Sequence, residues 1–115
     1  MSHSEKAVLD YADGLKRFSN MEMLYHKHLK KFLTDTTYQQ LVDAMQQQDY
    51  ETAFRQAHTL KGVTGNLSLV GFYDKLIPFV EALRDEADLV QAKAILPELE
   101  EAYQAAICEI EELGF

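Results

Sequence analysis

Residues 57–67 read Ala-His-Thr-Leu-Lys-Gly-Val-Thr-Gly-Asn-Leu, and on a helix with about 100° per residue they divide into two faces. His58, Lys61 and Gly65 share one face, and Gly62 flanks it. The other face, about half a turn away, carries small and apolar residues that indicate contact with a core: Ala53, Ala57, Leu60, Thr64 and Leu67. Glycine inside a helix costs about 1 kcal/mol relative to alanine. Two glycines beside a histidine therefore indicate that another molecule approaches the imidazole closely.

The rest of the chain has the pattern of further helices. The 115 residues include two prolines and five glycines and show almost no alternation of period two, which favours an all-α fold. Ser4 is a candidate cap for a short first helix that ends near Gly14. A longer helix is predicted to start at Ser19 or Asn20, and a short helix capped by Thr37 follows it.

The central helix has a clear start signal. Asp49 is a good N-cap for a helix that begins at Tyr50 and continues to about Ser68. The chain then turns around Gly71 into a helix that contains Pro78. We expect this proline to bend the helix, because it removes a backbone hydrogen bond.

The last predicted helix starts at Leu89, after a polar connector over residues 85–88, and carries apolar residues at steps of three and four. Pro97 is expected to kink or restart it, and Gly114 to end it. Four long amphipathic segments with short connections predict an antiparallel four-helix bundle, with the additional short N-terminal helix over one end. The expectation is a single domain over residues 1–115.

Composition and charge limit the possible partners. A formal net charge of −8 disfavours nucleic acids and anionic membranes, because phosphate binding needs clusters of lysine and arginine. No window approaches the apolar run of a membrane span, and the N-terminus lacks the pattern of a signal peptide. The one cysteine, Cys108, excludes an internal disulfide, and its apolar helix predicts that it is buried. These features favour a cytoplasmic protein whose partner is another protein.

The segment around His58 resembles the signature of histidine-containing phosphotransfer (HPt) domains. In that signature a lysine follows the histidine by three residues, a glycine by four and a small residue by seven. Lys61, Gly62 and Gly65 stand at these positions. The resemblance covers most of the chain and is strongest over residues 49–69.

The residue types in this segment fit phosphotransfer chemistry. Neutral imidazole, with an unperturbed pKa of about 6.5, is a competent nucleophile toward phosphorus, and the resemblance implies that His58 is the phosphorylated residue. Lys61, one turn on, can place its ammonium beside the phosphoryl oxygens, since this transfer needs mainly positioning and charge stabilisation. Gly62 and Gly65 leave room for the active-site loops of a partner. The family carries the phosphoryl group on the outer ring nitrogen, whereas the sequence itself allows either nitrogen.

Two apolar residues are candidate docking contacts for that partner. Phe54 falls on the His58 face, and Leu69 lies farther along nearly the same line. Phe54 is either such a contact or a residue at the edge of the core. Many domains of the family also supply a polar side chain, often an amide, from the next helix. The corresponding positions are Phe79, Val80 and Glu81, and none of them is a glutamine.

The histidines outside this segment do not have the spacing of a metal site. His26 and His28 are two residues apart and face different directions on a helix, whereas a metal pair needs a spacing of three or four. We therefore expect no metal and no cofactor in this chain, and we place the Mg²⁺ of the reaction in the acidic pocket of the partner. No Gly-rich loop of the phosphate-binding type occurs, so no ATP site is predicted.

The resemblance implies a phosphocarrier rather than an enzyme, acting in a phosphorelay of two-component signal transduction. His58 would become phosphohistidine by taking a phosphoryl group from an aspartate of one receiver domain, and would pass it to a second receiver. The expected partners are receiver domains of response regulators or of hybrid sensor kinases, and the chain is expected to be a freestanding monomer. The alternative is a helical interaction module that binds a receiver or a kinase without carrying phosphate.

Overall fold

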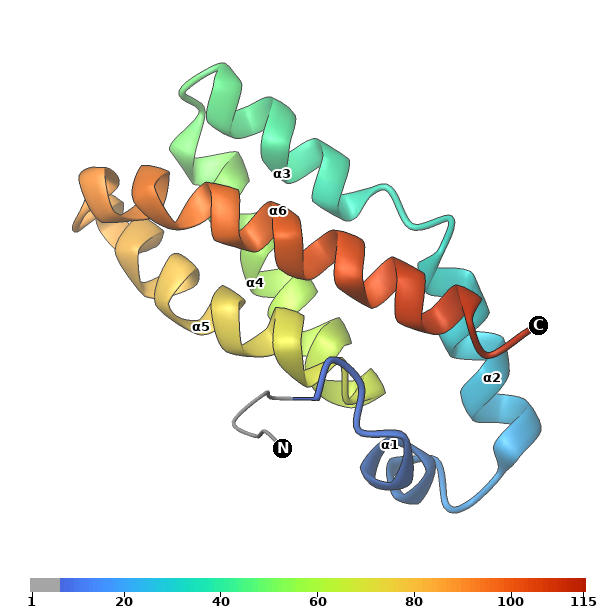
Figure 1. Cartoon of the computed structure of the whole chain (residues 1–115). Coiled ribbons are helices and arrows are strands. Elements are labelled where there is room, and N and C mark those ends of the chain that lie inside the picture. The colour runs from blue at the N-terminus through green and yellow to red at the C-terminus, as the bar shows by residue number, and fades with distance from the viewer. Residues whose placement is uncertain (1–6) are drawn as a thin grey trace.

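Figure 1 shows the computed structural model of the chain, which describes residues 7–115. Helices make up most of this range, and it contains no strand. The elements are α1 (Tyr11–Arg17), α2 (Glu22–Phe32), α3 (Thr37–Gln46), α4 (Tyr50–Leu67), α5 (Val70–Leu83), the 3-10 turn η1 (Arg84–Glu86) and α6 (Leu89–Glu111). All helices in this range are too short or too polar to cross a bilayer. The predicted all-α class is confirmed.

Helices α3, α4, α5 and α6 form the body of the bundle (Figure 1). Consecutive members are joined by short connections and therefore run antiparallel. Helix α4 packs between α3 and α5, and α5 packs against α6. The expected four-helix bundle is thus confirmed, but α3 rather than the longer α2 is its first member. Helix α2 touches α4 only lightly and lies with α1 at one end of the bundle.

Apolar side chains from all four helices fill the core. The predicted stripe on α4 is buried: Ala53, Ala57, Leu60, Thr64 and Leu67. Tyr38 of α3 stacks on Tyr103 of α6 with 4.1 Å between the ring centroids, and Phe72 of α5 meets both rings edge-on. Burial raises the pKa of the Tyr38 phenol, whose hydroxyl donates a hydrogen bond to Glu100. This packing fixes α4, so its opposite face is presented in a defined position.

Helix α4 begins and ends as predicted. The Asp49 carboxylate accepts a hydrogen bond from the Thr52 N–H at 3.2 Å, which makes Asp49 the N-cap. The helix ends at Leu67, and Ser68 then adopts a left-handed conformation with φ of 57°. This conformation is uncommon for residues other than glycine, and it redirects the chain into α5.

The first helix starts and ends later than predicted. Helix α1 begins at Tyr11, with Asp10 as its N-cap, and continues to Arg17. The cap predicted at Ser4 lies outside the described residues. The predicted end at Gly14 is wrong, because this glycine lies in the middle of the helix.

Gly14 has a packing role instead. It is buried inside α1, and a Cβ at this position would overlap the phenol of Tyr25 from α2. The Tyr25 hydroxyl in turn donates a hydrogen bond to the Leu67 carbonyl at 2.8 Å, at the end of α4. These contacts attach α1 and α2 to one end of the bundle.

Helix α2 also starts later than predicted, at Glu22. Ser19 and Asn20 have left-handed φ values of 56° and 60°, so they form the turn between α1 and α2 rather than an N-cap. In α3, Thr36 is the N-cap and Thr37 is the first helical residue. The predicted start of this helix therefore differs from the observed start by one residue.

Both prolines lie inside continuous helices. Pro78 is in α5 and Pro97 in α6, so the last helix is not restarted at its proline. Helix α6 ends at Glu111, before Gly114. Cys108 is exposed, and the prediction that it is buried is wrong, because the buried stripe of α6 passes on the other side of the helix.

Candidate functional site

His58 lies on the exposed face of α4, opposite the buried stripe. Neither of its ring nitrogens forms a hydrogen bond within residues 7–115. The ring lies against that of Phe54, with the centroids 6.0 Å apart and the planes at 41°. The imidazole is therefore an accessible nucleophile, and a well-packed helix holds its backbone.

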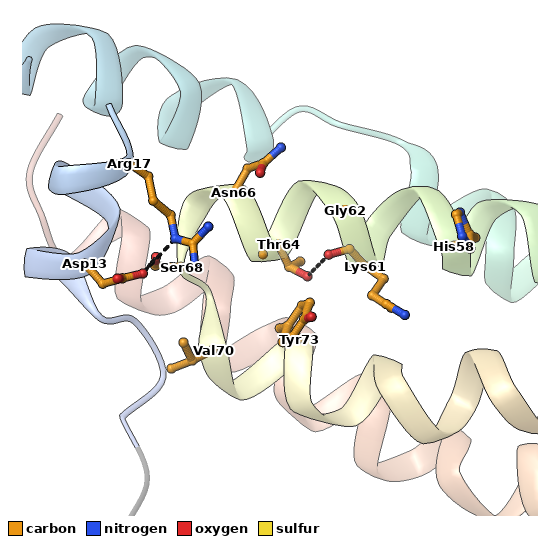
Figure 2. Close-up of a pocket in the computed structure, with 11 residues that line it drawn as sticks. Asp13, Arg17, His58, Lys61, Gly62, Thr64, Asn66, Ser68, Val70 and Tyr73 are labelled. Atoms are coloured by element: carbon orange, nitrogen blue, oxygen red, sulfur yellow. Dashed lines mark hydrogen bonds and ion pairs between the residues drawn. The ribbon is translucent and has the colours of Figure 1, made fainter. Parts of the chain in front are cut away.

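A pocket of about 380 Å³ extends along α4 from His58 toward the end of the helix (Figure 2). Lys61, Gly62 and Gly65, which the sequence placed beside His58, line this pocket, and Tyr73 enters it from α5. The remaining lining residues come from α1, from the second half of α4 and from the turn into α5: Asp13, Arg17, Thr64, Asn66, Ser68 and Val70. The structure thus gathers the predicted acceptor, lysine and glycines in one concave surface.

The Lys61 side chain is half-buried and reaches from α4 toward α5 (Figure 2). Its ammonium has no ion pair in the part of the chain that the structure describes. The pKa of the Glu81 carboxyl on α5 is lowered, mainly by a hydrogen bond from Arg84 and to a smaller extent by the charge of Lys61. The Lys61 ammonium is therefore available to an anion bound at His58.

The two glycines of the motif have different surroundings. A Cβ on Gly62 would meet no atom of residues 7–115 within 4 Å, apart from the backbone of its own helix, so the surface there is open. A Cβ on Gly65 would lie 3.1 Å from Cε1 of Tyr73. The space at Gly62 is free for a partner, whereas the space at Gly65 is taken by an aromatic ring of the protein itself. Gly65 therefore leaves less room for a partner than its lack of a side chain predicts.

The two apolar docking candidates have opposite outcomes. Phe54 is partly buried against the core and also lines a shallow pocket of about 320 Å³ together with His58, so it combines both predicted roles in position. Leu69 is fully buried, with 0% of its surface exposed, and the prediction that it faces a partner is wrong. The left-handed turn at Ser68 ends the helix, so the helical line drawn from Phe54 does not reach Leu69.

A polar network that the sequence did not reveal closes the far end of the larger pocket (Figure 2). The Ser68 hydroxyl donates a hydrogen bond to Oδ2 of Asp13 at 2.6 Å, and Nε of Arg17 donates to the same oxygen at 2.8 Å. The pKa of Asp13 is lowered first by the bond from Arg17 and then by that from Ser68. Only the spacing of four residues between Asp13 and Arg17 was a signal in the sequence.

Helix α5 carries no amide side chain at the positions where the family often has one, Phe79, Val80 and Glu81. Phe79 and Val80 are fully buried, and Glu81 is exposed and forms an ion pair with Arg84 at 3.1 Å. The polar side chain that α5 places in the pocket beside α4 is instead that of Tyr73, which the sequence analysis did not single out.

The other two histidines of residues 7–115 have their own partners. Nε2 of His26 lies 2.6 Å from the Tyr11 hydroxyl, and Nδ1 of His28 lies within hydrogen-bond distance, 2.9 Å, of the Leu24 carbonyl. Within residues 7–115, His, Cys, Asp and Glu side chains form no group of three that could hold a metal ion.

An exposed histidine in the middle of a bundle helix, with an unpaired lysine one turn on, is the arrangement that the resemblance to histidine phosphotransfer domains implies. Comparison with known families agrees with this class. The model of the Hpt domain family matches residues 33–109, which is more than half of the chain, and the protein belongs to this family. The matched range runs from the end of α2 into α6 and includes His58.

The comparisons with curated proteins and with solved structures gave no match. Domains of the Hpt family take part in phosphotransfer in two-component systems and interact with receiver domains. They are phosphocarrier modules rather than enzymes.

Proposed function

We propose that this protein is an intermediate of a phosphorelay, in which His58 takes a phosphoryl group from the aspartate of one receiver domain and delivers it to the aspartate of another. The observation that carries the proposal is the exposed imidazole of His58, free of hydrogen bonds in the described range and lining one pocket with Lys61. The donors and acceptors would be receivers of response regulators or of hybrid sensor kinases.

In the first transfer, the lone pair of a ring nitrogen of His58 forms a bond to phosphorus. The bond from phosphorus to the aspartate oxygen breaks, and its electron pair stays on the carboxylate of the receiver. The proton on the other ring nitrogen is not needed for bond formation and can pass to water. The second transfer is the same exchange in reverse, onto the aspartate of another receiver.

Charge stabilisation and access are the contributions of the neighbouring residues. Such transfers depend mainly on in-line positioning and on cations beside the phosphoryl oxygens. Lys61 and Arg17 both line the pocket with His58, but Arg17 is paired with Asp13, so Lys61 is the cation that remains available. The open surface at Gly62 supports the approach of a receiver loop. Phe54 beside the histidine supports an apolar contact with the same partner. We assign the Mg²⁺ of the reaction to the acidic pocket of the receiver and no cofactor to this chain.

The test uses a panel of phosphorylated receivers and the intact mass of the protein. Wild-type protein should gain the mass of one phosphoryl group, and His58→Gln should gain none while its helical circular dichroism is unchanged. His28→Gln is a matched control, because His28 is also exposed and is followed by Lys31 at the same spacing, but it lacks the flanking glycines. We expect this control to be labelled like wild type.

Binding of a receiver without any labelling of wild-type protein would favour the alternative function, a helical module that docks without carrying phosphate. Labelling that persists in His58→Gln would show that another residue is the acceptor. The presence of both His58 and Lys61 argues for the phosphocarrier, since a module that only docks needs neither.

A further inference from the structure

The end of α5 places a second cation close to His58. Arg84 binds Glu81 through two hydrogen bonds, from Nη2 at 3.1 Å and from Nε at 3.3 Å. Its guanidinium carbon lies 5.1 Å from the centroid of the Phe54 ring, and that ring contacts His58. Arg84 and His58 also line the same shallow pocket of about 320 Å³.

The ion pair that holds Arg84 is of the weak kind. The side chains of Arg84 and Glu81 are 46% and 57% exposed, respectively. Exposed ion pairs contribute little free energy because water and salt screen them. A phosphoryl group brings about two negative charges and three acceptor oxygens. It is therefore a stronger ligand for a guanidinium than a single solvated carboxylate.

The charges around His58 change when the phosphoryl group arrives. Before transfer, Lys61 and Arg84 both lie near the carboxylate of Glu81, whose lowered pKa is caused mainly by Arg84 and in smaller part by Lys61. Arg84 also lies near the carboxylate of Asp85. After transfer, the anionic charge of the phosphoryl group exceeds what Lys61 alone can neutralise. Arg55 also lines the shallow pocket, but it is paired with Glu51 at 3.6 Å on its own helix.

We propose that Arg84 is a second phosphoryl-binding cation of this site: it leaves Glu81 when His58 is phosphorylated and donates hydrogen bonds to the phosphoryl oxygens. Glu81 holds Arg84 above the Phe54 ring in the unphosphorylated protein and competes with the phosphoryl group for it. Only hydrogen bonds are exchanged in this step, and the bonds to phosphorus are those of the transfer itself. The inference rests on the proposed role of His58 as the acceptor.

The experiment measures how fast the full-length protein is labelled by phosphoramidate, a small donor that needs no receiver. Arg84→Gln should slow labelling about threefold, as expected for loss of one exposed charge contact, and Arg84→Lys should restore part of the rate. Glu81→Gln should accelerate labelling, because it frees Arg84 and removes a competing carboxylate. The slowing in Arg84→Gln should shrink in about 1 M salt, where charges are screened over about 3 Å.

Lys75→Gln is the matched control. It removes the same charge, but Lys75 lies inside α5, on the side that faces α6, where it pairs with Glu98 at 2.7 Å. Its labelling rate should equal that of wild type. A direct readout is the Arg84 Nε–H signal in nitrogen NMR, which should move on phosphorylation of wild-type protein and stay in place in His58→Gln treated in the same way.

The results separate the two proposals. If wild-type protein labels on His58 but Arg84→Gln and Lys75→Gln label at the same rate, the role of Arg84 is overturned and that of His58 stands. If wild-type protein takes up no phosphoryl group on His58 from either donor, the proposed function itself fails.

Discussion

The ring of Tyr73 occupies the space that a side chain on Gly65 would need, with Cε1 at 3.1 Å from the position of a Cβ. At the equivalent position on Gly62, no atom of the described residues beyond the helix's own backbone lies within 4 Å. The two glycines belong to one motif, but their surroundings differ. Gly65 lets α5 place an aromatic ring against α4, whereas Gly62 leaves the helix surface bare beside His58.

Alanine at the two glycines should have different effects on stability. Gly62→Ala should raise the free energy of unfolding by up to about 1 kcal/mol, because helix propensity improves and nothing is displaced. Gly65→Ala should gain less or lose stability, since the Tyr73 ring must move by a few tenths of an ångström. Urea unfolding of both variants measures this. In a Tyr73→Ala background the Gly65→Ala gain should reappear, and equal gains in the wild-type background would contradict the assignment.

A bulky residue at Gly62 should separate docking from chemistry. Gly62→Gln should fold normally, because the position is open, and should keep its rate of labelling by phosphoramidate. The same side chain should obstruct a receiver, so labelling by a phospho-receiver should slow at least several-fold. Gly65→Gln is a poorer test, because it would also displace Tyr73. Equal retention of both rates in Gly62→Gln would mean that the receiver does not dock on this surface.

Removal of the Lys61 charge should affect transfer and not folding. Lys61→Ala should slow labelling of His58 by a phospho-receiver, because one cation beside the phosphoryl oxygens is lost. Its free energy of unfolding should stay within about 0.5 kcal/mol of wild type, as for other surface substitutions. Parallel transfer assays and urea unfolding measure the two effects. A transfer rate equal to that of wild type would remove Lys61 from the mechanism.

The Asp13 network should make stability depend on pH in the acid range. The pKa of Asp13 is lowered, first by Arg17 and then by Ser68. A carboxyl with a lowered folded-state pKa stabilises the fold above its unfolded pKa of about 3.9, and this contribution is lost as the pH falls through the folded value. Asp13→Asn should therefore be less stable than wild type at neutral pH, and the difference should close on acidification.

Unfolding curves from neutral pH into the acid range measure this difference directly. Ser68→Ala removes one of the two hydrogen bonds to Asp13. The free energy of unfolding of this variant should therefore change less with pH than that of wild type. A difference between Asp13→Asn and wild type that is the same at every pH would mean that the charge of Asp13 does not act through this network.

The features that could be predicted from sequence are those that one helix determines by itself. Spacing within α4 determines the N-cap at Asp49, the buried stripe ending at Leu67 and the position of His58 and Lys61 on the opposite face. Local capping and periodicity are sufficient for such features. The bundle class followed because the other amphipathic segments have the same kind of pattern.

The errors concern residues whose neighbours come from other helices. The prediction that Gly14 ends a helix is wrong because the residue that requires a glycine there, Tyr25, lies on α2. The prediction that Leu69 lies on the docking face is wrong because it assumes that the helix continues past Ser68, where the left-handed backbone ends it. The ion pair of Glu81 with Arg84 could be foreseen from its spacing, but its position above the Phe54 ring required the packing of α5 on α4.

The division of α4 into a buried stripe and an exposed reactive face makes the two kinds of mutational damage separable. In a saturation scan of this helix, substitutions at Ala57, Leu60 and Thr64 should lower the abundance of the protein, because each of them is buried. Substitutions at His58 and Gly62 should leave abundance intact and abolish or redirect signalling. Substitutions on the exposed face can then alter the choice of partner while the buried stripe, and with it the fold, stays the same. The positions of the two faces alternate along the sequence with the helical repeat of about 3.6 residues.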